Sequence, residues 1–157
     1  MRLVRNVALL AFVLLWGAAA SQSVQPPSIQ EFNDRLVQQL SKRIEGREDE
    51  PAERVFKNIK LEWFKPVPAK QLLDIMNGGY ARALGVRCTH CHVEDDFASD
   101  DRRPKRAARE MATMHWDINQ RLGQMENLES APEDRFINCA TCHRGATDPN
   151  ESQRHKN

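Results

Sequence analysis

The sequence has few of the side chains that build a large hydrophobic core. Only 6% of its 157 residues are aromatic, and its mean hydropathy is −0.66. A small domain with so little apolar material is marginally stable on its own. An excess of positive charge is also missing: 23 Lys and Arg stand against 22 Asp and Glu, so there is no basic field of the kind that binds nucleic acid. We therefore exclude nucleic acid as a partner and expect another source of apolar bulk.

The chain also has few cysteines, and every one belongs to the same repeated motif. The chain holds four cysteines, and all fall in two copies of the pattern C-x-x-C-H, at residues 88–92 and 139–143. This is the attachment pattern for c-type haem. On a helical turn the two cysteines share a face and can form thioethers to one porphyrin, while the next histidine offers its imidazole to the iron. The sequence predicts two covalently attached haem c groups, which also supply apolar bulk, bound through Cys88, Cys91, Cys139 and Cys142, with His92 and His143 as iron ligands.

Three other uses of the cysteines fit less well. Disulfides would leave the histidine that ends each motif unexplained. A zinc site would want roughly 15–20 residues between its two cysteine pairs, whereas 47 residues separate Cys91 from Cys139. A thioredoxin-like redox pair needs a βαβ context, and neither motif has a convincing strand pattern beside it.

The N-terminus has the features of a secretory signal peptide. Arg2 and Arg5 precede an apolar run at residues 7–15, and small residues follow at 17–20. The pattern predicts removal of residues 1–20 and a periplasmic location. The apolar run falls short of the ~20 residues that a spanning helix wants, so we expect membrane association only through a partner or an uncleaved signal.

The rest of the chain divides into three parts. Residues 21–52 are predicted to be a linker and an amphipathic helix, because Ser28 and Glu31 have the spacing of a capping box and Gly46 is a stop signal. Residues 53–146 are predicted to be the dihaem cytochrome domain, and residues 147–157 a disordered tail.

Within the domain, each half is predicted to run helix, loop and C-x-x-C-H motif. Residues 55–68 alternate in part and suggest a short extended segment. A helix with an apolar stripe should follow Pro68, weakened or interrupted by the glycines at 78 and 79. The clearest helix opens at Pro104 and carries one apolar face: Ala107, Met111, Met114, His115, Ile118 and Leu122. The fold class is therefore mostly α, with little β.

The sixth ligand of each iron decides what the haems can do. Methionine is a soft ligand that raises the reduction potential. Met76 is the only methionine shortly before the first motif, so it is the candidate for the first haem. Met111, Met114 and His115 share one helical face and are all eligible for the second, and spacing does not choose among them.

The order of these segments resembles the c-type cytochrome subunit of photosynthetic reaction centres, and more closely the short dihaem members of that family. The resemblance spans about residues 53–146 and rests on residues 55–60, Met76, residues 84–93, 97–100, 108–114, 118–119 and 139–145. It implies a helical protein in which a helix donates methionine from across each haem. By position, Met76 matches the sixth ligand of the first haem, and Met111 that of the second, with Met114 and His115 as alternatives. The photosynthetic members have four haem motifs, whereas this chain has two.

The resulting hypothesis is an electron carrier and not an enzyme. Two His/Met-ligated haems would pass electrons between redox partner proteins, either periplasmic or in a membrane complex. One alternative is a dihaem peroxidase-type enzyme, which needs an open iron site and acid–base groups. Another is a haem-containing subunit of a larger membrane redox complex. The acidic loop at residues 94–101 is read as solvated, with steering of a basic partner as its alternative role.

Overall fold

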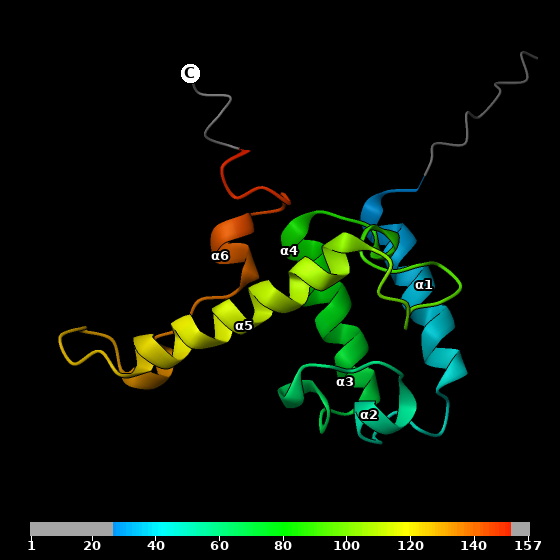
Figure 1. Cartoon of the computed structure of the whole chain (residues 1–157), viewed down its shortest axis with the longest axis horizontal. Helices are drawn as coiled ribbons and strands as arrows, with labels where there is room; N and C mark the ends of the chain where they lie inside the picture. Colours follow the sequence, from blue (N-terminus) through cyan, green and yellow to red (C-terminus); the bar gives the residue numbers. More distant parts are fainter. Residues whose placement is uncertain (1–26, 152–157) are drawn as a thin grey trace, which may run out of the picture.

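Helices account for nearly all regular structure in residues 27–151, the part of the chain that the computed structural model describes (Figure 1). The α-helices are α1 (Ile29–Arg43), α2 (Ala52–Val55), α3 (Ala69–Asp74), α4 (Arg82–Leu84), α5 (Arg103–Gly123) and α6 (Cys139–His143). A π-helical segment, η2 (Ile75–Ala81), joins α3 to α4, and three single turns are 3-10 helical: η1 (Glu62–Phe64), η3 (Cys88–His90) and η4 (Pro132–Asp134). Between residues 27 and 151, β pairing is limited to two isolated bridges. The predicted mostly α fold is confirmed. The predicted signal peptide and the last part of the predicted tail lie outside the described residues.

Helix α1 begins where the sequence predicts. The Ser28 hydroxyl accepts a hydrogen bond from the Glu31 amide at 3.2 Å, and the Glu31 carboxylate accepts one from the Ser28 amide at 2.8 Å. These two bonds form the predicted capping box. The helix ends at Arg43, and Gly46 lies just beyond it with a φ of +79°, a conformation that glycine adopts without strain.

The segment from α3 to α4 is one helical run with a widened middle. We predicted that the glycines at 78 and 79 would weaken or interrupt it, and the run continues through them as a π-helix. Single π turns of this kind occur often at functional sites. Met76 lies within this wider turn.

The predicted extended segment at residues 55–68 is present only in part: Phe56 and Leu61 have extended backbone, but no β-strand forms. Helix α2 ends at Val55 and the 3-10 turn η1 follows, with no strand between them. The chain instead folds back on α2, where the Ala52 amide donates to the Val67 carbonyl at 2.8 Å and the Ala69 amide donates to the Glu50 carbonyl at 2.9 Å. The local alternation of apolar residues was misleading because a strand needs a neighbouring strand, and this segment has only the Pro51–Pro68 bridge.

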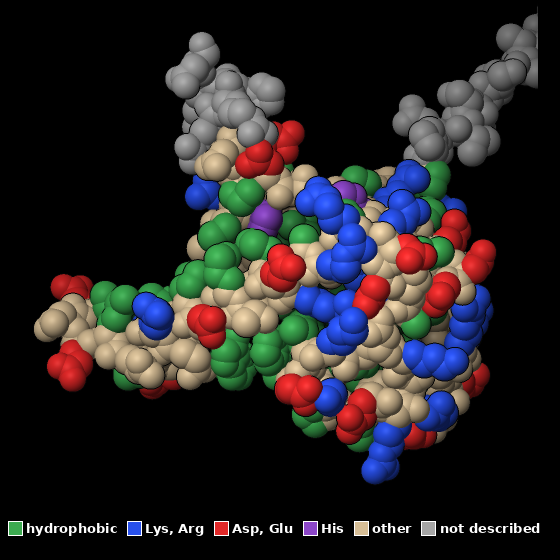
Figure 2. All heavy atoms as spheres, viewed as in Figure 1, with side chains coloured by type: hydrophobic (Ala, Val, Ile, Leu, Met, Phe, Trp, Pro, Cys, Tyr) green, Lys and Arg blue, Asp and Glu red, His purple; other side chains and the backbone are tan. Residues whose placement is uncertain are grey.

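Helix α5 is the longest element and begins and ends as predicted, with proline in its first turn and Gly123 as its last residue. Its C-terminal half and the following loop project from the rest of the molecule (Figure 1). Hydrophobic side chains gather along this projection (Figure 2). Within residues 27–151, most of the exposed large apolar residues lie on α5 or in the segment that follows it: Met111, Met114, Trp116, Met125, Leu128 and Phe136.

The buried core is small and built mainly of alanine. The main cluster joins Ile44 of α1 to Ala69 and Leu73 of α3, and partly buried side chains pack around it. Among the described residues, five of the eight buried hydrophobic residues are alanines, and the largest fully buried side chain belongs to the polar Asn33. A core of this size leaves much of each helix's apolar surface to be covered by something other than protein, as the composition indicates.

Candidate haem sites

The first C-x-x-C-H motif forms a helical turn that α1 holds in place. The amides of Cys91 and His92 donate to the Cys88 carbonyl at 3.2 and 3.0 Å, so the motif has the predicted turn. Asn33, only 1% exposed, donates to the Val86 carbonyl at 3.0 Å and accepts from the Cys88 amide at 2.9 Å. Sequence reasoning missed Asn33; its one signal was a polar residue next to the apolar stripe of α1.

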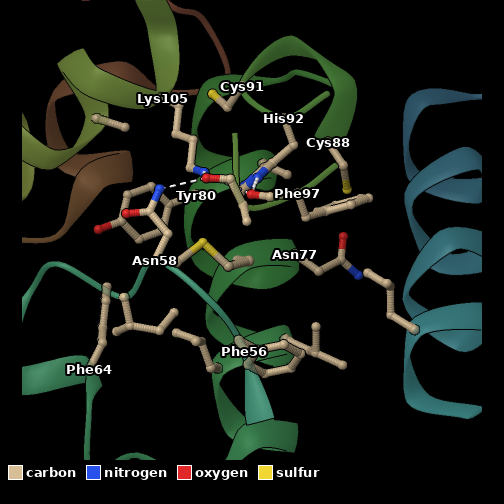
Figure 3. Close-up of a pocket in the computed structure, with 18 of the residues that line it drawn as sticks. Phe56, Asn58, Phe64, Asn77, Tyr80, Cys88, Cys91, His92, Phe97 and Lys105 are labelled. Carbon is tan, nitrogen blue, oxygen red and sulfur yellow. Dashed lines mark hydrogen bonds between the residues drawn. The ribbon is translucent and has the colours of Figure 1, made fainter. Parts of the chain in front are cut away.

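A cavity of about 440 Å³, cavity one, lies beside this motif. Met76 on η2 lines it together with Cys88, Cys91 and His92, so the structure brings the four candidate residues for the first haem around one space. Figure 3 shows the two cysteines and His92 on one side of this space and Phe56 and Phe64 on another. The remaining wall is largely apolar, as expected for a cofactor site, and includes Phe56, Ile59, Leu72, Leu73 and Phe97.

His92 is oriented as a metal ligand would be. Its Nδ1 lies 3.1 Å from the Phe97 carbonyl oxygen. A carbonyl can only accept, so Nδ1 carries the proton and the Nε2 lone pair is left for a metal. Burial lowers the pKa of His92, which keeps the imidazole neutral, the form in which histidine binds metals. The Phe97 ring stacks on the imidazole at 5.0 Å and restricts its rotation.

The thiols have the chemistry of attachment points and not of a redox pair. All four cysteines lie within the described residues and none forms a disulfide. Burial raises the pKa of the Cys88, Cys91 and Cys139 thiols. Redox-active C-x-x-C pairs depend instead on a thiol whose pKa is lowered. Two cysteines, a neutral histidine and a methionine around an apolar cavity are a donor set that fits one haem c.

The loop after the first motif is fixed by charged side chains and is not simply solvated. Asp100, 27% exposed, accepts hydrogen bonds from Lys60 at 2.7 Å, Arg109 at 2.8 Å and Asn58 at 2.9 Å. These donors hold the pKa of Asp100 well below its usual range. Our reading of residues 94–101 as a solvated loop is therefore wrong for Asp100. The acidic residues of the loop that are fully exposed are Glu94, Asp95, Asp96 and Asp101.

The second motif forms helix α6 and repeats the histidine arrangement of the first. Asn138 caps the helix by accepting from the Thr141 amide at 3.1 Å, while the Thr141 hydroxyl accepts from the Asn138 amide at 3.1 Å. His143 Nδ1 lies 3.0 Å from the Ala146 carbonyl, so here too Nδ1 donates and Nε2 is left for a metal. Cys139 is partly buried and Cys142 is exposed.

A second cavity, cavity two, lies between η2, α5 and α6 and measures about 830 Å³. Cys139 and His115 line it, along with Trp63 and Trp116, whose rings stack at 5.1 Å. Within residues 27–151, its lining includes neither Met111 nor Met114, nor His143 or Cys142; the two methionines lie on α5, 40% and 46% exposed. The structure therefore brings fewer of the predicted residues together here than at cavity one.

His115 holds the chain that enters the second motif. Its Nε2 lies 2.7 Å from the Ile137 carbonyl, and Asn119 pairs with the same peptide, accepting from the Ile137 amide at 2.7 Å and donating to its carbonyl at 3.0 Å. Asn119 Nδ2 also lies 2.9 Å from the same Nε2, so this nitrogen is engaged within the protein and is not left for a metal.

The two cavities are neighbours. Phe64 and Tyr80 line both, and the helical run through η2 contributes residues to each. The flanks of the motifs also meet: the Gly145 amide donates to the Ala83 carbonyl at 2.8 Å, and a Cβ on Gly85 would lie 2.0 Å from the Gly145 carbonyl oxygen. Cavity one is lined entirely by residues between 37 and 109, whereas cavity two draws on residues from 63 to 145.

Comparisons with known proteins agree with this picture. A family model for the photosynthetic reaction centre cytochrome C subunit matches residues 15–157. The chain is 37% identical to cytochrome c-554 of Chloroflexus aurantiacus over 76 residues, which are 48% of this chain and 18% of that protein. It is 38% identical to the photosynthetic reaction center cytochrome c subunit of Rubrivivax gelatinosus over 81 residues, 45% of this chain and 22% of that protein. The chain thus matches about a fifth of the length of these curated relatives. No solved structure matches. Among residues 27–151, no helix is long and apolar enough to cross a bilayer.

Proposed function

The chain belongs to the photosynthetic reaction centre cytochrome c subunit family, and from that premise we propose that it carries electrons between redox partners through two covalently attached haem c groups. Bound haem c supplies a one-electron couple whose potential depends on its axial ligands and surroundings. The observation that supports the proposal most is the shared lining of cavity one, to which Met76, Cys88, Cys91 and His92 all contribute.

At the first site each residue has one task. Cys88 and Cys91 would hold the porphyrin, His92 would bind the iron through Nε2, and Met76, which lines the same cavity, would be its sixth ligand. The hydrogen bond from His92 to the Phe97 carbonyl fixes the ring and its tautomer, as outer partners of metal-bound histidines do. The apolar lining excludes water, which favours electron exchange over ligand chemistry at the iron.

At the second site Cys139 and Cys142 would hold the porphyrin, and His143 would bind the iron. We propose Met111 as the sixth ligand, with Met114 and His115 as the alternatives. A methionine is favoured over His115 because Nε2 of that histidine already contacts the Ile137 carbonyl and the Asn119 side-chain amide. The choice of Met111 over Met114 rests on the family resemblance.

We place the protein in the periplasm, exported by residues 1–20, with redox proteins as its partners. An electron carrier is favoured over a peroxidase-type enzyme because Met76 lines cavity one together with His92 and because α5 carries eligible ligands for the second haem. Filled axial positions on both irons leave no open site for peroxide. A high-spin ferric band or turnover of hydrogen peroxide by the purified protein would reverse this preference.

The haem count is tested by expressing the full chain with its own N-terminus under haem-attachment conditions and measuring the haem-to-chain ratio as the pyridine haemochrome. We expect two haems per chain. Replacing both cysteines of either motif with serine should remove one haem and leave the other. A ratio of one in the wild type, or no covalent haem, would contradict the proposal.

The sixth ligands are tested by near-infrared spectra of the ferric protein, where methionine–iron coordination gives its own band. Met76→Ala and Met111→Ala should each remove the band of one haem. Met114→Ala is the matched control, because it lies on the same helix with similar exposure and should leave both bands in place. Loss of a band in Met114→Ala but not in Met111→Ala would move the assignment three residues along α5.

A role as a haem subunit of a larger membrane redox complex is the second candidate. Met125, Leu128 and Phe136 are 46%, 41% and 66% exposed and line neither cavity, so the proposed haems do not account for their exposure. Surfaces of this kind often mark interfaces. Copurification of a membrane complex with the wild type, but not with a Phe136→Ser variant that keeps both haems, would support this role.

A further inference from the structure

Lys105, in the first turn of α5, is a buried charged side chain beside cavity one. It is only 8% exposed and lines the cavity. Its Nζ donates to three backbone carbonyls in the loop after the first motif, those of Phe97 at 2.7 Å, Ala98 at 3.0 Å and Ser99 at 2.7 Å. Three carbonyl acceptors require three N–H donors, which the ammonium has and the neutral amine lacks. The geometry therefore belongs to a positively charged Lys105.

One of these carbonyls also serves the proposed iron ligand. The Phe97 carbonyl accepts from His92 Nδ1 at 3.1 Å and from Lys105 Nζ at 2.7 Å. Lys105, His92 and Phe97 lie close together in Figure 3. A single oxygen thus links a buried ammonium to the imidazole, with the ammonium making the shorter contact.

The charge of Lys105 is only partly neutralised. Asp100 is the nearby carboxylate, 3.5 Å from Lys105 Nζ, but it makes shorter contacts with Lys60 at 2.7 Å and Arg109 at 2.8 Å. One carboxylate therefore faces three cations. The other acids at this cavity, Asp95 and Asp96, are exposed, so water and salt screen them. Lys105 and Arg109 keep net positive charge on the buried wall.

We propose that Lys105 is a positioning residue that raises the reduction potential of the haem held at residues 88–92. The inference rests on the proposed function. Reduction adds one electron, supplied by a donor protein, and lowers the positive charge at the site, so a fixed ammonium nearby favours the reduced state. Lys105 also donates to the Phe97 carbonyl oxygen, and this competition weakens the hydrogen bond that His92 Nδ1 donates to the same oxygen. The imidazole then gives less electron density to the oxidised metal. Its three bonds keep the loop, and therefore His92, in one orientation.

The test is a potentiometric titration of the haem-loaded full chain and of Lys105→Met. We expect one of the two potentials to fall, by about tenfold in the redox equilibrium constant, which is about 59 mV for a one-electron couple, and the other to stay. Lys105→Arg keeps the charge and should restore most of the shift. Lys60→Met is the matched control: it removes the same charge beside Asp100, but this lysine is 58% exposed and does not contact the Phe97 carbonyl, so screening should keep its effect well below that of Lys105→Met.

Each outcome decides the inference. Unchanged potentials in Lys105→Met would overturn it, and so would an equal shift in Lys60→Met, because the effect would then come from net charge alone. If Lys105→Met does not retain its haem, Lys105→Gln is measured instead, since its amide can still donate to the loop without the charge. A wild type with haem at both motifs but no shift in these variants refutes only the role of Lys105. A wild type without haem at residues 88–92 refutes the proposed function as well.

Discussion

Replacing Gly85 with alanine should loosen the contact between the two halves of the molecule. Gly85 has a φ of +64°, and a Cβ at this position would lie 2.0 Å from the Gly145 carbonyl oxygen and 2.9 Å from its carbon. No real Cβ contact is that short, and the obstacle is backbone, so the chain after α6 must move. The hydrogen bond from the Gly145 amide to the Ala83 carbonyl, at 2.8 Å, would then be lost.

The cost has two parts. A left-handed conformation costs a non-glycine residue about 1–2 kcal/mol, and the lost hydrogen bond and its neighbouring contacts about 1–2 kcal/mol more. We therefore expect Gly85→Ala to lower the free energy of unfolding of the haem-loaded protein by about 3 kcal/mol, measured by urea denaturation.

Gly46 is the control that separates the cost of the backbone conformation from the cost of the lost contacts. It also has a positive φ, +79°, but a Cβ there would meet nothing within 4 Å. Gly46→Ala should therefore show only the conformational cost, about 1–2 kcal/mol. Faster amide exchange at residue 145 should accompany Gly85→Ala and be absent from Gly46→Ala. If the two variants lose equal stability and exchange alike, the Gly85–Gly145 contact does not join the halves and the reasoning fails.

Three further predictions follow from the contacts around the first site. Asn33→Ala leaves the partly buried Val86 carbonyl and Cys88 amide without this partner, so the free energy of unfolding in urea should fall by about 2 kcal/mol; the exposed Gln30→Ala is its control, and an equal loss there would contradict the role of Asn33. Because folding lowers the pKa of Asp100, its contribution to stability is full above the ordinary carboxyl range, near pH 4, and is lost as the pH falls through the folded pKa. The stability advantage of the wild type over Asp100→Asn should therefore persist at neutral pH and shrink only in strong acid; an advantage independent of pH would refute the charge-based account. Finally, Asp95→Asn with Asp101→Asn should slow reduction by a basic partner at low salt, and an unchanged rate would remove steering as a role of this loop.

The features that the sequence predicts well are those set by neighbouring residues. The C-x-x-C-H motifs contain their own turn and ligand chemistry, the Ser28–Glu31 pair begins α1, and the proline at 104 lies in the first turn of α5. Each depends on contacts within a few positions, which a pattern can reveal.

The features that the sequence did not reveal depend on distant partners. The segment at 55–68 looked extended, but no strand lies beside it. Lys105 looked like an ordinary basic residue at a helix start, and only the fold of residues 97–99 over it makes it buried. Asp100 looked like one more acid in an acidic run, because its partners Lys60 and Asn58 lie 40 or more residues away. The choice of Met111 over Met114 stays a prediction, because both are exposed on α5.

The two cavities are lined by different parts of the chain, and this difference bears on the order in which the protein is assembled. Every residue that lines cavity one precedes residue 110, so the chain can form this site before the second motif has been synthesised. Cavity two needs η2 and α4 from the first half, and its own motif docks on Ala83 and Gly85. We therefore expect an asymmetry between the two sites: loss of the first motif should impair the second more than loss of the second impairs the first.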